Sequence, residues 1–512
     1  MHGVLRLLAC VLLIGLQACA QLEPLPERAA ESAIPPSEDS PLDQATSSLE
    51  AQHAGESAFR LVVEGPEAFA ARVQSARMAA RSLDVQTYIW HADLTGIFIA
   101  NELIAAADRG VRVRVLLDDL DARAKNAGFG ALAAHPNIDV RLFNPFASRA
   151  GVLGFLGEGI RSFRRINRRM HNKSWIADNR LAIVGGRNVG DEYFGASDEV
   201  NFVDLDFAMI GPVVRDASFA FDAYWNSTSA YPMEALDPKA VDEAALQKLR
   251  MALRARSTEA ENSRYAVSLR SNDTIRRMMS GDVAIEWSGT YRFIADDPAK
   301  VTMEEEDAAR SQVGAAIAPI ARSTETDLVI ISPYFVPGEA GSQLLMELAR
   351  AGKRVDVLTN SLVANDVAAV HGGYSRYRKR LLEGGVQLWE LKPVFGSTAD
   401  ASLFGSSGAS LHTKALAVDG KTIFVGSYNL DPRSTWLNCE QGVLVENATL
   451  ANQLEAIFAN QTLGRRAWRV TIAGGGLRWS DDYESFDSDP RAGLGRRFQA
   501  WLTRVLRLEA QL

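Results

Sequence analysis

The sequence predicts an α/β protein made of two duplicated halves that share one active site. A strand–helix–strand pattern with continuous apolar strands occurs twice, and such strands are typical of parallel sheets covered on both faces. Equivalent residues also recur at a nearly constant offset. The offsets are 243 residues from Asp84 to Asp327, 242 from Gly110 to Gly352 and 241 from His171 to His412. A drift of two residues over so long a span indicates a duplication.

Each repeated unit is expected to contain a strand, a helix and a second strand. The predicted ranges are 83–90, 96–109 and 111–117 in the first half, and 326–332, 342–350 and 354–358 in the second. Gly110 and Gly352 follow the two helices, where a residue in the left-handed conformation commonly ends a helix. Parallel pairing of the two strands in each unit follows from this order.

The segments outside the halves differ in composition. Residues 20–57 are rich in Pro, Ser, Glu and Ala without apolar periodicity, which predicts a flexible tether. The expected organisation is a leader over 1–19, this tether, a first half over 58–236, a connector over 237–300, a second half over 301–468 and a C-terminal extension over 469–512.

The leader has the features of a signal peptide. One arginine precedes an apolar run over 7–16, which is shorter than the ~20 residues that span a bilayer as a helix. The run ends in Leu16-Gln17-Ala18-Cys19, which resembles a bacterial lipoprotein signal with Cys19 as the lipidated residue. The prediction is a membrane-anchored lipoprotein of the cell envelope, with Ala20 favouring the outer membrane if the cell is Gram-negative. A cleaved signal and an uncleaved short anchor are the alternatives.

Composition narrows the class of protein. Hydrophobic residues make up 47% and charged residues 23%, which is the balance of a globular chain. The formal net charge of −8 argues against a dedicated nucleic-acid binder, which is usually basic. Of three cysteines only Cys439 lies beyond the leader, so no disulfide is expected within the folded body.

Two copies of His-x-Lys-x4-Asp are the candidate catalytic residues. They are His171, Lys173 and Asp178 in the first half, and His412, Lys414 and Asp419 in the second. Histidine and lysine two apart on a strand project from the same face. Each aspartate precedes a predicted hairpin turn, and Asn188 and Asn429 follow the hairpins at matching positions, 241 residues apart.

These residue types suit transfer of a phosphodiester. Lysine ammoniums and the Asn188 and Asn429 amides can donate to the negatively charged phosphate oxygens. Imidazole is a nucleophile at phosphorus and also exchanges protons near neutral pH. Each histidine needs a carboxylate to orient its far nitrogen, and Asp206 and Glu440 are the candidates.

Two other readings of the motif are possible. An old duplication could keep these polar residues for structural reasons, although one such match at a given histidine arises by chance only about once in 400. A metal site is the second alternative, but lysine is not a usual ligand and no third histidine is nearby in the sequence.

The paired motifs with their Gly/Asn tails resemble the phospholipase D superfamily, whose members build one active site from two duplicated halves. The resemblance is closer to the C-type branch of the bacterial cardiolipin synthases and covers nearly everything from 61 to 468. The segments that carry it are 84–90, 142–146, 167–174, 184–188, 358–362 with Asn365-Asp366, and 408–412.

This resemblance implies two phospholipase D-like α/β sandwich halves and a two-step phosphatidyl transfer without metal or cofactor. His171 would attack the donor phospholipid and His412 would act as acid and base. Phosphatidylglycerol would be the acceptor, and phosphatidylethanolamine is a possible further substrate. The expected partners are these lipids and a membrane surface but no nucleic acid, and no protein partner is indicated.

Two segments are candidates for contact with the membrane. Residues 151–157 form an apolar, glycine-rich run before an arginine cluster, and residues 496–506 form a basic amphipathic stretch. Packing against the body is the alternative for both. The competing functions are a phospholipase D-type hydrolase, a nuclease of the same superfamily and a non-catalytic envelope lipoprotein.

Overall fold

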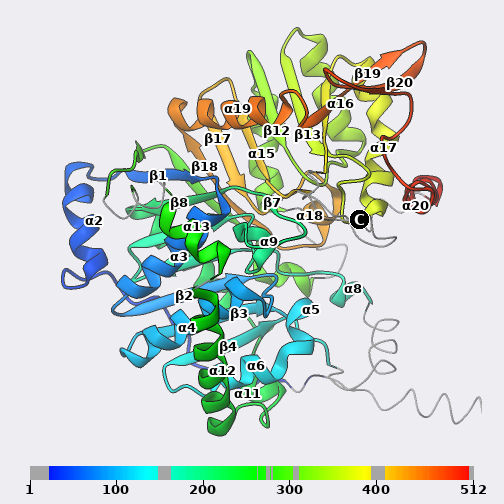
Figure 1. Ribbon diagram of the computed structural model, residues 1–512. Coiled ribbons are helices and arrows are strands. Elements are labelled where there is room, and N and C mark those ends of the chain that lie inside the picture. Colours follow the sequence, from blue (N-terminus) through cyan, green and yellow to red (C-terminus); the bar gives the residue numbers. More distant parts are fainter. Residues whose placement is uncertain are drawn as a thin grey trace, which may run out of the picture.

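A computed structural model describes residue 22 and residues 24–147, 163–261, 263–272, 277, 281–303, 311–393 and 410–506. Its elements form two α/β halves, each built on one large mixed sheet (Figure 1). The leader with Cys19 and the apolar run 151–157 lie outside the described residues. Among the described residues no helix combines the length and apolar character needed to cross a bilayer.

The N-terminal half contains a nine-stranded sheet in the order β10-β1-β8-β6-β5-β2-β3-β4-β9. Its strands are β1 (Ser57–Val62), β2 (Ser82–Thr87), β3 (Arg112–Asp118), β4 (Ile138–Phe143), β5 (Ser174–Ala177), β6 (Leu181–Gly185), β8 (Asp206–Ile210), β9 (Ala230–Pro232) and β10 (Glu286–Ser288). Its helices include α3 (Gly65–Met78), α4 (Leu94–Asp108), α5 (Asp119–Ala122), α6 (Asn126–Ala133), α8 (Phe163–Ile166), α9 (Asp191–Phe194), α10 (Pro212–Trp225) and α11 (Met233–Leu236).

The C-terminal half contains a ten-stranded sheet in the order β11-β18-β17-β16-β12-β13-β14-β19-β20-β21. Its strands are β11 (Tyr291–Ala295), β12 (Asp327–Ile331), β13 (Arg354–Asn360), β14 (Gln387–Leu391), β16 (Ala415–Val418), β17 (Thr422–Gly426), β18 (Gln441–Glu446), β19 (Ala467–Ala473), β20 (Gly476–Ser480) and β21 (Ser485–Phe486). Its helices are α15 (Gln312–Arg322), α16 (Gly338–Arg350), α17 (Ala368–Glu383), α18 (Pro432–Trp436), α19 (Ala448–Thr462) and α20 (Leu494–Leu506).

The duplication is visible in the strand pairings. The first strand of each repeated unit pairs in parallel with the second, β2 with β3 and β12 with β13. Gly110 and Gly352 have φ values of 94° and 84°, the left-handed conformation expected after α4 and α16. The match of Asp84 with Asp327 is wrong. The Asp178 amide donates to the Ser82 carbonyl and the Asp419 amide donates to the Asp327 carbonyl, so Ser82 is the residue equivalent to Asp327 and the offset there is 245. Short insertions between elements account for the larger drift.

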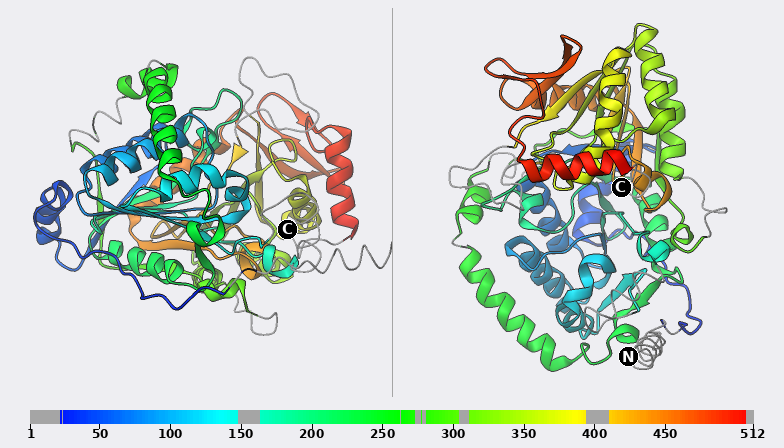
Figure 2. Two further views of the ribbon diagram at one scale, coloured as in Figure 1. Left: turned by 90° about the horizontal axis from the view of Figure 1, so that it is seen from below. Right: turned by 90° about the vertical axis from the view of Figure 1, so that its right-hand side faces the viewer.

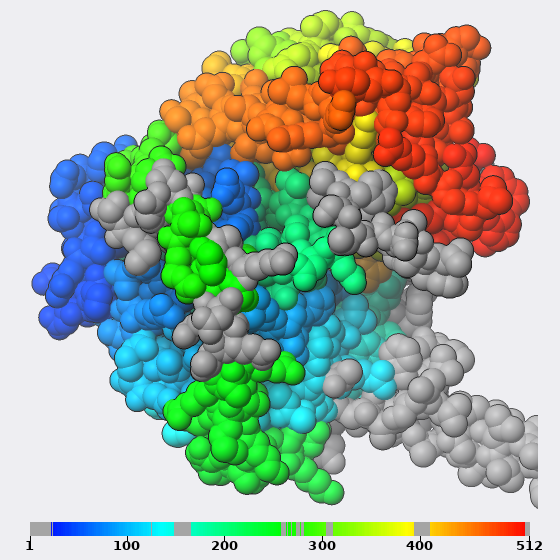
Figure 3. All heavy atoms as spheres, in the orientation of Figure 1, coloured from blue at the N-terminus to red at the C-terminus, as the bar shows by residue number. Residues whose placement is uncertain are grey.

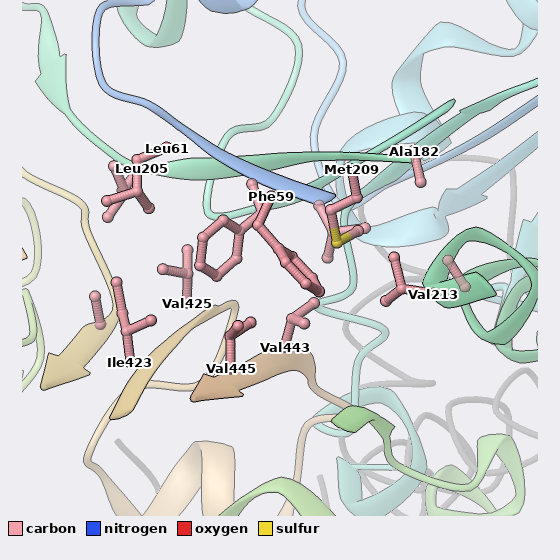
Figure 4. Packing of buried hydrophobic residues seen from close by; sticks show 14 of the residues in the cluster. Phe59, Leu61, Ala182, Leu205, Met209, Val213, Ile423, Val425, Val443 and Val445 are labelled. Atoms are coloured by element: carbon pink, nitrogen blue, oxygen red, sulfur yellow. The ribbon is translucent and has the colours of Figure 1, made fainter. Parts of the chain in front are cut away.

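The two sheets pack against each other through their apolar inner faces. Phe59 and Met209 of the first sheet approach Val443 and Val445 of the second in one continuous cluster of buried residues (Figure 4). Burial of this surface is the main force that holds the halves together, because apolar area removed from water stabilises in proportion to its extent. Met170 and Leu411, which directly precede the motif histidines, belong to this cluster.

The connector links the sheets at their edges. After α12 (Glu243–Glu261) and α13 (Arg264–Ser271), β10 pairs with β1 of the first sheet. The chain then turns, and β11 pairs with β18 of the second sheet. The connector therefore contributes a strand to each half and does not form a separate domain.

Two predicted boundaries are wrong. Within the expected tether 20–57, residues Pro41–Gln52 form helix α2, which a Ser40–Asp43 capping box begins. The buried Asp43 carboxylate pairs with Arg81 and Arg180, which fixes α2 to the N-terminal half. At the other end, a boundary at 469 divides strand β19, which pairs with β14 and continues the sheet.

Candidate active site

Each motif histidine is held by backbone bonds to the opposite half. In the N-terminal half, the His171 amide donates to the Cys439 carbonyl at 2.9 Å, and the Cys439 amide donates to the Arg169 carbonyl at 2.8 Å. In the C-terminal half, β15 (Ser410–Leu411) pairs in parallel with β7 (Phe202–Val203), and the His412 amide donates to the Val203 carbonyl at 2.8 Å. The two motifs are therefore brought together by reciprocal backbone pairing between the halves.

The side-chain contacts of the histidines also cross from one half to the other. The Nδ1 atom of His171 lies 2.9 Å from Oε2 of Glu440, and Nδ1 of His412 lies 2.6 Å from Oδ2 of Asp204. Because an ionised carboxylate can only accept, each Nδ1 carries the proton and each Nε2 keeps its lone pair. Each histidine is therefore oriented by a carboxylate of the opposite half.

The two lysines have the same local geometry. Lys173 Nζ donates to the His171 carbonyl at 2.6 Å, and Lys414 Nζ donates to the His412 carbonyl at 2.5 Å. Lys173 and Lys414 are both buried, at 2% exposure. Each lysine ammonium acts on the pKa of the other half's histidine, so the four groups share one electrostatic environment.

Burial sets the protonation of this cluster. It lowers the pKa of His171 to about 4 and that of His412 to about 3, helped by the neighbouring ammoniums, so both imidazoles are neutral at pH 7. Burial also lowers the pKa of Lys414 to about 8. It opposes ionisation of Asp204 and Glu440 too, but the histidine and lysine contacts outweigh it and lower both carboxyl pKa values.

The two asparagines of the glycine-rich tails differ in their surroundings. The Asn188 amide oxygen accepts from the Ile89 amide at 3.2 Å, and its Nδ2 donates to the Tyr193 hydroxyl at 2.9 Å. Among the described residues, the buried Oδ1 of Asn429 has no hydrogen-bond partner. Of the two, Asn429 has the side chain with unused hydrogen-bonding capacity.

Asp178 and Asp419 were expected among the catalytic residues, but their carboxylates bind backbone amides away from the histidines. Asp178 accepts from the backbone amides of Ala80, Arg81 and Ser82 at 2.8–2.9 Å. Asp419 accepts in the same way from the amides of residues 325–327. Both residues have positive φ, 50° and 55°, at tight turns. They anchor the β5–β6 and β16–β17 hairpins and do not contact the histidines.

Asp178→Ala is therefore expected to destabilise the fold more than it impairs the chemistry. Three backbone amides, of which that of Ser82 is buried, would lose a charged acceptor, which costs about 2–4 kcal/mol of unfolding free energy. Thermal unfolding should show a lower Tm, while turnover per folded molecule stays within a few-fold of the unsubstituted protein. Loss of turnover at an unchanged Tm would return Asp178 to the chemistry.

The prediction that Asp206 orients a histidine is also wrong. Its carboxylate lies 3.0 Å from Arg72 and 3.2 Å from Arg187, in a fully buried ion-pair cluster. Gly185 pairs with Asp206 in one half and Gly426 pairs with Gly442 in the other, so the residue equivalent to Glu440 is Asp204. A Cβ on Gly186 would lie 2.2 Å from Asp204 Oδ1, so the glycine makes room for this carboxylate.

Aromatic residues that the sequence analysis missed surround the imidazoles. Tyr88 contacts His171 edge-on at 5.1 Å, and Phe202 stacks on His412 at 5.2 Å. Tyr193 contacts His412 and also bonds Asn188. Alignment of the apolar strands 207–209 and 443–445 would have found Asp204, but no sequence signal pointed to the aromatic residues.

Comparisons with known proteins agree with this geometry. A family model described as "Cardiolipin synthase, PLD-like domain" matches residues 72–225 and 317–462, more than half of the chain. The chain belongs to this family. The resemblance to the phospholipase D superfamily is thereby confirmed, and the protein is a phosphatidyltransferase of that superfamily.

Individual relatives place it within the family. Cardiolipin synthase C of Escherichia coli (strain K12) is 41% identical over 467 residues, which cover 90% of this chain and 97% of that protein. Cardiolipin synthase A of Pseudomonas syringae pv. syringae is 26% identical over 78% of this chain and 67% of its own length. The fold is similar to that of a phosphatidylserine synthase from Haemophilus influenzae, with a TM-score of 0.57 at 14% identity, covering 88% of this chain and 94% of that one.

Proposed function

We propose that the protein is a cardiolipin synthase that transfers a phosphatidyl group to phosphatidylglycerol through a phosphatidyl-histidine. The observation that carries the proposal is the reciprocal pair His171–Glu440 and His412–Asp204, which leaves two Nε2 atoms free for chemistry in one buried site. The 41% identity to cardiolipin synthase C of Escherichia coli supports the choice of substrate.

In the first step Nε2 of His171 attacks the phosphorus of the donor phospholipid. The bond from phosphorus to the departing alcohol breaks, and His412 gives that oxygen a proton. The anionic phosphate raises the pKa of the neutral His412 when it binds, so uptake of a proton accompanies binding. Glu440 balances the positive charge that develops on His171.

In the second step a phosphatidylglycerol hydroxyl attacks the phosphatidyl-histidine. His412 now takes the hydroxyl proton, the bond between phosphorus and Nε2 of His171 breaks, and cardiolipin leaves. Lys173 and Lys414 stabilise the negative charge on the phosphate oxygens in both steps, and the Nδ2 group of Asn429 donates a further hydrogen bond. The assignment of attack to His171 rests on the superfamily resemblance.

The rate should fall on the alkaline side of neutrality. Lys414 loses its charge as pH rises through about 8, so kcat/KM, which reports the free enzyme, is expected to decrease above that value. Lys414→Arg keeps the charge and should move this limb to higher pH. A limb that stays in place in Lys414→Arg would assign it to another group.

Product analysis tests the function directly. Purified protein is incubated with labelled phosphatidylglycerol, with and without phosphatidylethanolamine, and the lipids are separated by chromatography. Labelled cardiolipin supports the proposal. Phosphatidic acid without cardiolipin would instead identify a phospholipase D-type hydrolase.

We also propose that lipidation of Cys19 anchors the protein in the cell envelope, with the outer membrane favoured. The support is the leader sequence, a short apolar run that ends in Leu16-Gln17-Ala18-Cys19. Metabolic labelling with a palmitate analogue should mark the protein, and Cys19→Ser should remove the label. A label that survives Cys19→Ser would refute the proposal.

A further inference from the structure

Helix α20 presents an apolar face to solvent. Leu494 is 87% exposed, Phe498 61%, Trp501 48% and Val505 53%, and their spacing of three or four residues places them along one side of the helix. Among the described residues, sixteen large hydrophobic side chains are exposed, and six of them lie on this helix. An exposed patch of this kind marks an interaction surface.

The opposite side of α20 is already docked on the C-terminal half. Ala500 and Thr503 are buried against α17, and a Cβ on Gly372 would lie 2.4 Å from the Ala500 carbonyl. The Arg496 guanidinium donates to the carbonyls of Leu362 and Asn365 at 3.1 and 2.6 Å. The helix therefore docks on the body through a different face from the one that carries the exposed apolar side chains. Figure 2 shows α20 on the outer side of the C-terminal half, and in Figure 3 its surface projects at the edge of the molecule.

The chemistry of the exposed side suits an anionic bilayer. Between Leu494 and Leu506 there is no acidic residue, and of the three arginines Arg504 is exposed, whereas Arg496 and Arg497 donate to backbone carbonyls. Phe498 and Trp501 stack at 5.8 Å, so two aromatic rings lie together on the apolar face. Aromatic and aliphatic side chains with flanking arginines favour shallow insertion between anionic headgroups.

The helix is also tied to the active site. The carbonyls that bind Arg496 belong to the segment just after β13. Asn360, the last residue of β13, both accepts from the Leu411 amide and donates to the Leu411 carbonyl, at 2.9 Å each. Leu411 immediately precedes His412, so a helix fixed at the membrane would fix the orientation of the site.

We propose that α20 inserts its apolar face into the headgroup region of an anionic phospholipid bilayer and holds the active site against that surface. The inference rests on the proposed function in one respect, that the substrates are lipids of this bilayer. The insertion itself is independent of which product the enzyme makes.

Lipid-borne quenchers test the insertion. Full-length Val505→Cys is labelled with a polarity-sensitive fluorophore and mixed with vesicles of phosphatidylcholine and phosphatidylglycerol that carry a doxyl-labelled lipid. Unsubstituted protein gives the background from the native cysteines Cys10, Cys19 and Cys439. Phe219→Cys is the matched control, because Phe219 is 72% exposed on α10 of the other half. Quenching at position 505 and not at 219 is expected, with less quenching when phosphatidylglycerol is omitted.

Equal quenching at both positions, or none at 505, would overturn the proposal. Protection of the label at 505 that depends on protein concentration without lipid would instead assign this face to a second copy of the chain. None of these outcomes depends on turnover, so they are separate from a failure to make cardiolipin.

A double substitution, Phe498→Glu with Trp501→Glu, tests the consequence for activity. Loss of two inserted aromatic rings should weaken binding to anionic vesicles about tenfold or more. Turnover of lipids in vesicles should fall with it, whereas turnover of monomeric short-chain phosphatidylglycerol should be unchanged. Equal losses on both substrates would show damage to the fold or the site and would contradict a membrane role.

Discussion

His171→Ala and His412→Ala are each expected to reduce phosphatidyl transfer by about a thousandfold or more. His171→Ala removes the proposed nucleophile, and His412→Ala removes the group that moves protons in both steps. Both substitutions leave a small gap beside Tyr88 or Phe202, so the fold should survive. Transfer is measured with labelled phosphatidylglycerol on protein whose Tm is recorded in parallel.

The two variants should also differ from each other. In His412→Ala, Nε2 of His171 can still attack the phosphorus of the donor lipid, so this variant should release the alcohol slowly and then stop. His171→Ala should release none. Near-normal turnover in either variant would refute a two-histidine mechanism.

Glu440→Gln and Asp204→Asn are expected to lower kcat by about 10²–10³-fold with little change in KM. An amide can donate to Nδ1 as well as accept from it, so it no longer fixes the tautomer that leaves Nε2 free. It also fails to balance the charge on the imidazolium. Because each carboxylate contacts a histidine of the opposite half, both variants directly test whether one half orients the histidine of the other.

Asp206→Asn is the matched control for these variants. This residue is two positions from Asp204 and equally buried, but it pairs with Arg72 and Arg187. Its substitution should lower Tm, since breaking a buried ion pair typically costs about 3–5 kcal/mol, while kcat per folded molecule stays near normal. If Asp206→Asn lowers kcat as much as Asp204→Asn does, the assignment of Asp204 is wrong.

The sequence predicted the architecture because the relevant signals are local and occur twice. Apolar strands, glycines after helices and a motif at a constant offset require no knowledge of long-range contacts. The sequence could not show that each histidine takes its carboxylate from the other half, because that pairing depends on how the two sheets pack. Asp206 was therefore chosen in place of Asp204 by a register error of two residues.

The prediction of a flexible tether over 20–57 was wrong for a related reason, since it also depends on contacts between distant residues. Residues 41–52 contain too few apolar side chains to predict a core helix, yet Asp43 binds Arg81 and Arg180 of the folded half. Asp178 and Asp419 belong to the same class of error. Their place in the repeated motif suggested chemistry, whereas their partners are backbone amides about 95 residues away in the chain.

The most direct test of the mechanism is the covalent intermediate. His412→Ala is mixed with phosphatidylglycerol, quenched under conditions that preserve phosphoramidates, digested and analysed by mass spectrometry. The two-histidine mechanism predicts a phosphatidyl group on the peptide that contains His171, and none when His171→Ala is added. The absence of any adduct while alcohol is released, or an adduct at another residue, would contradict it.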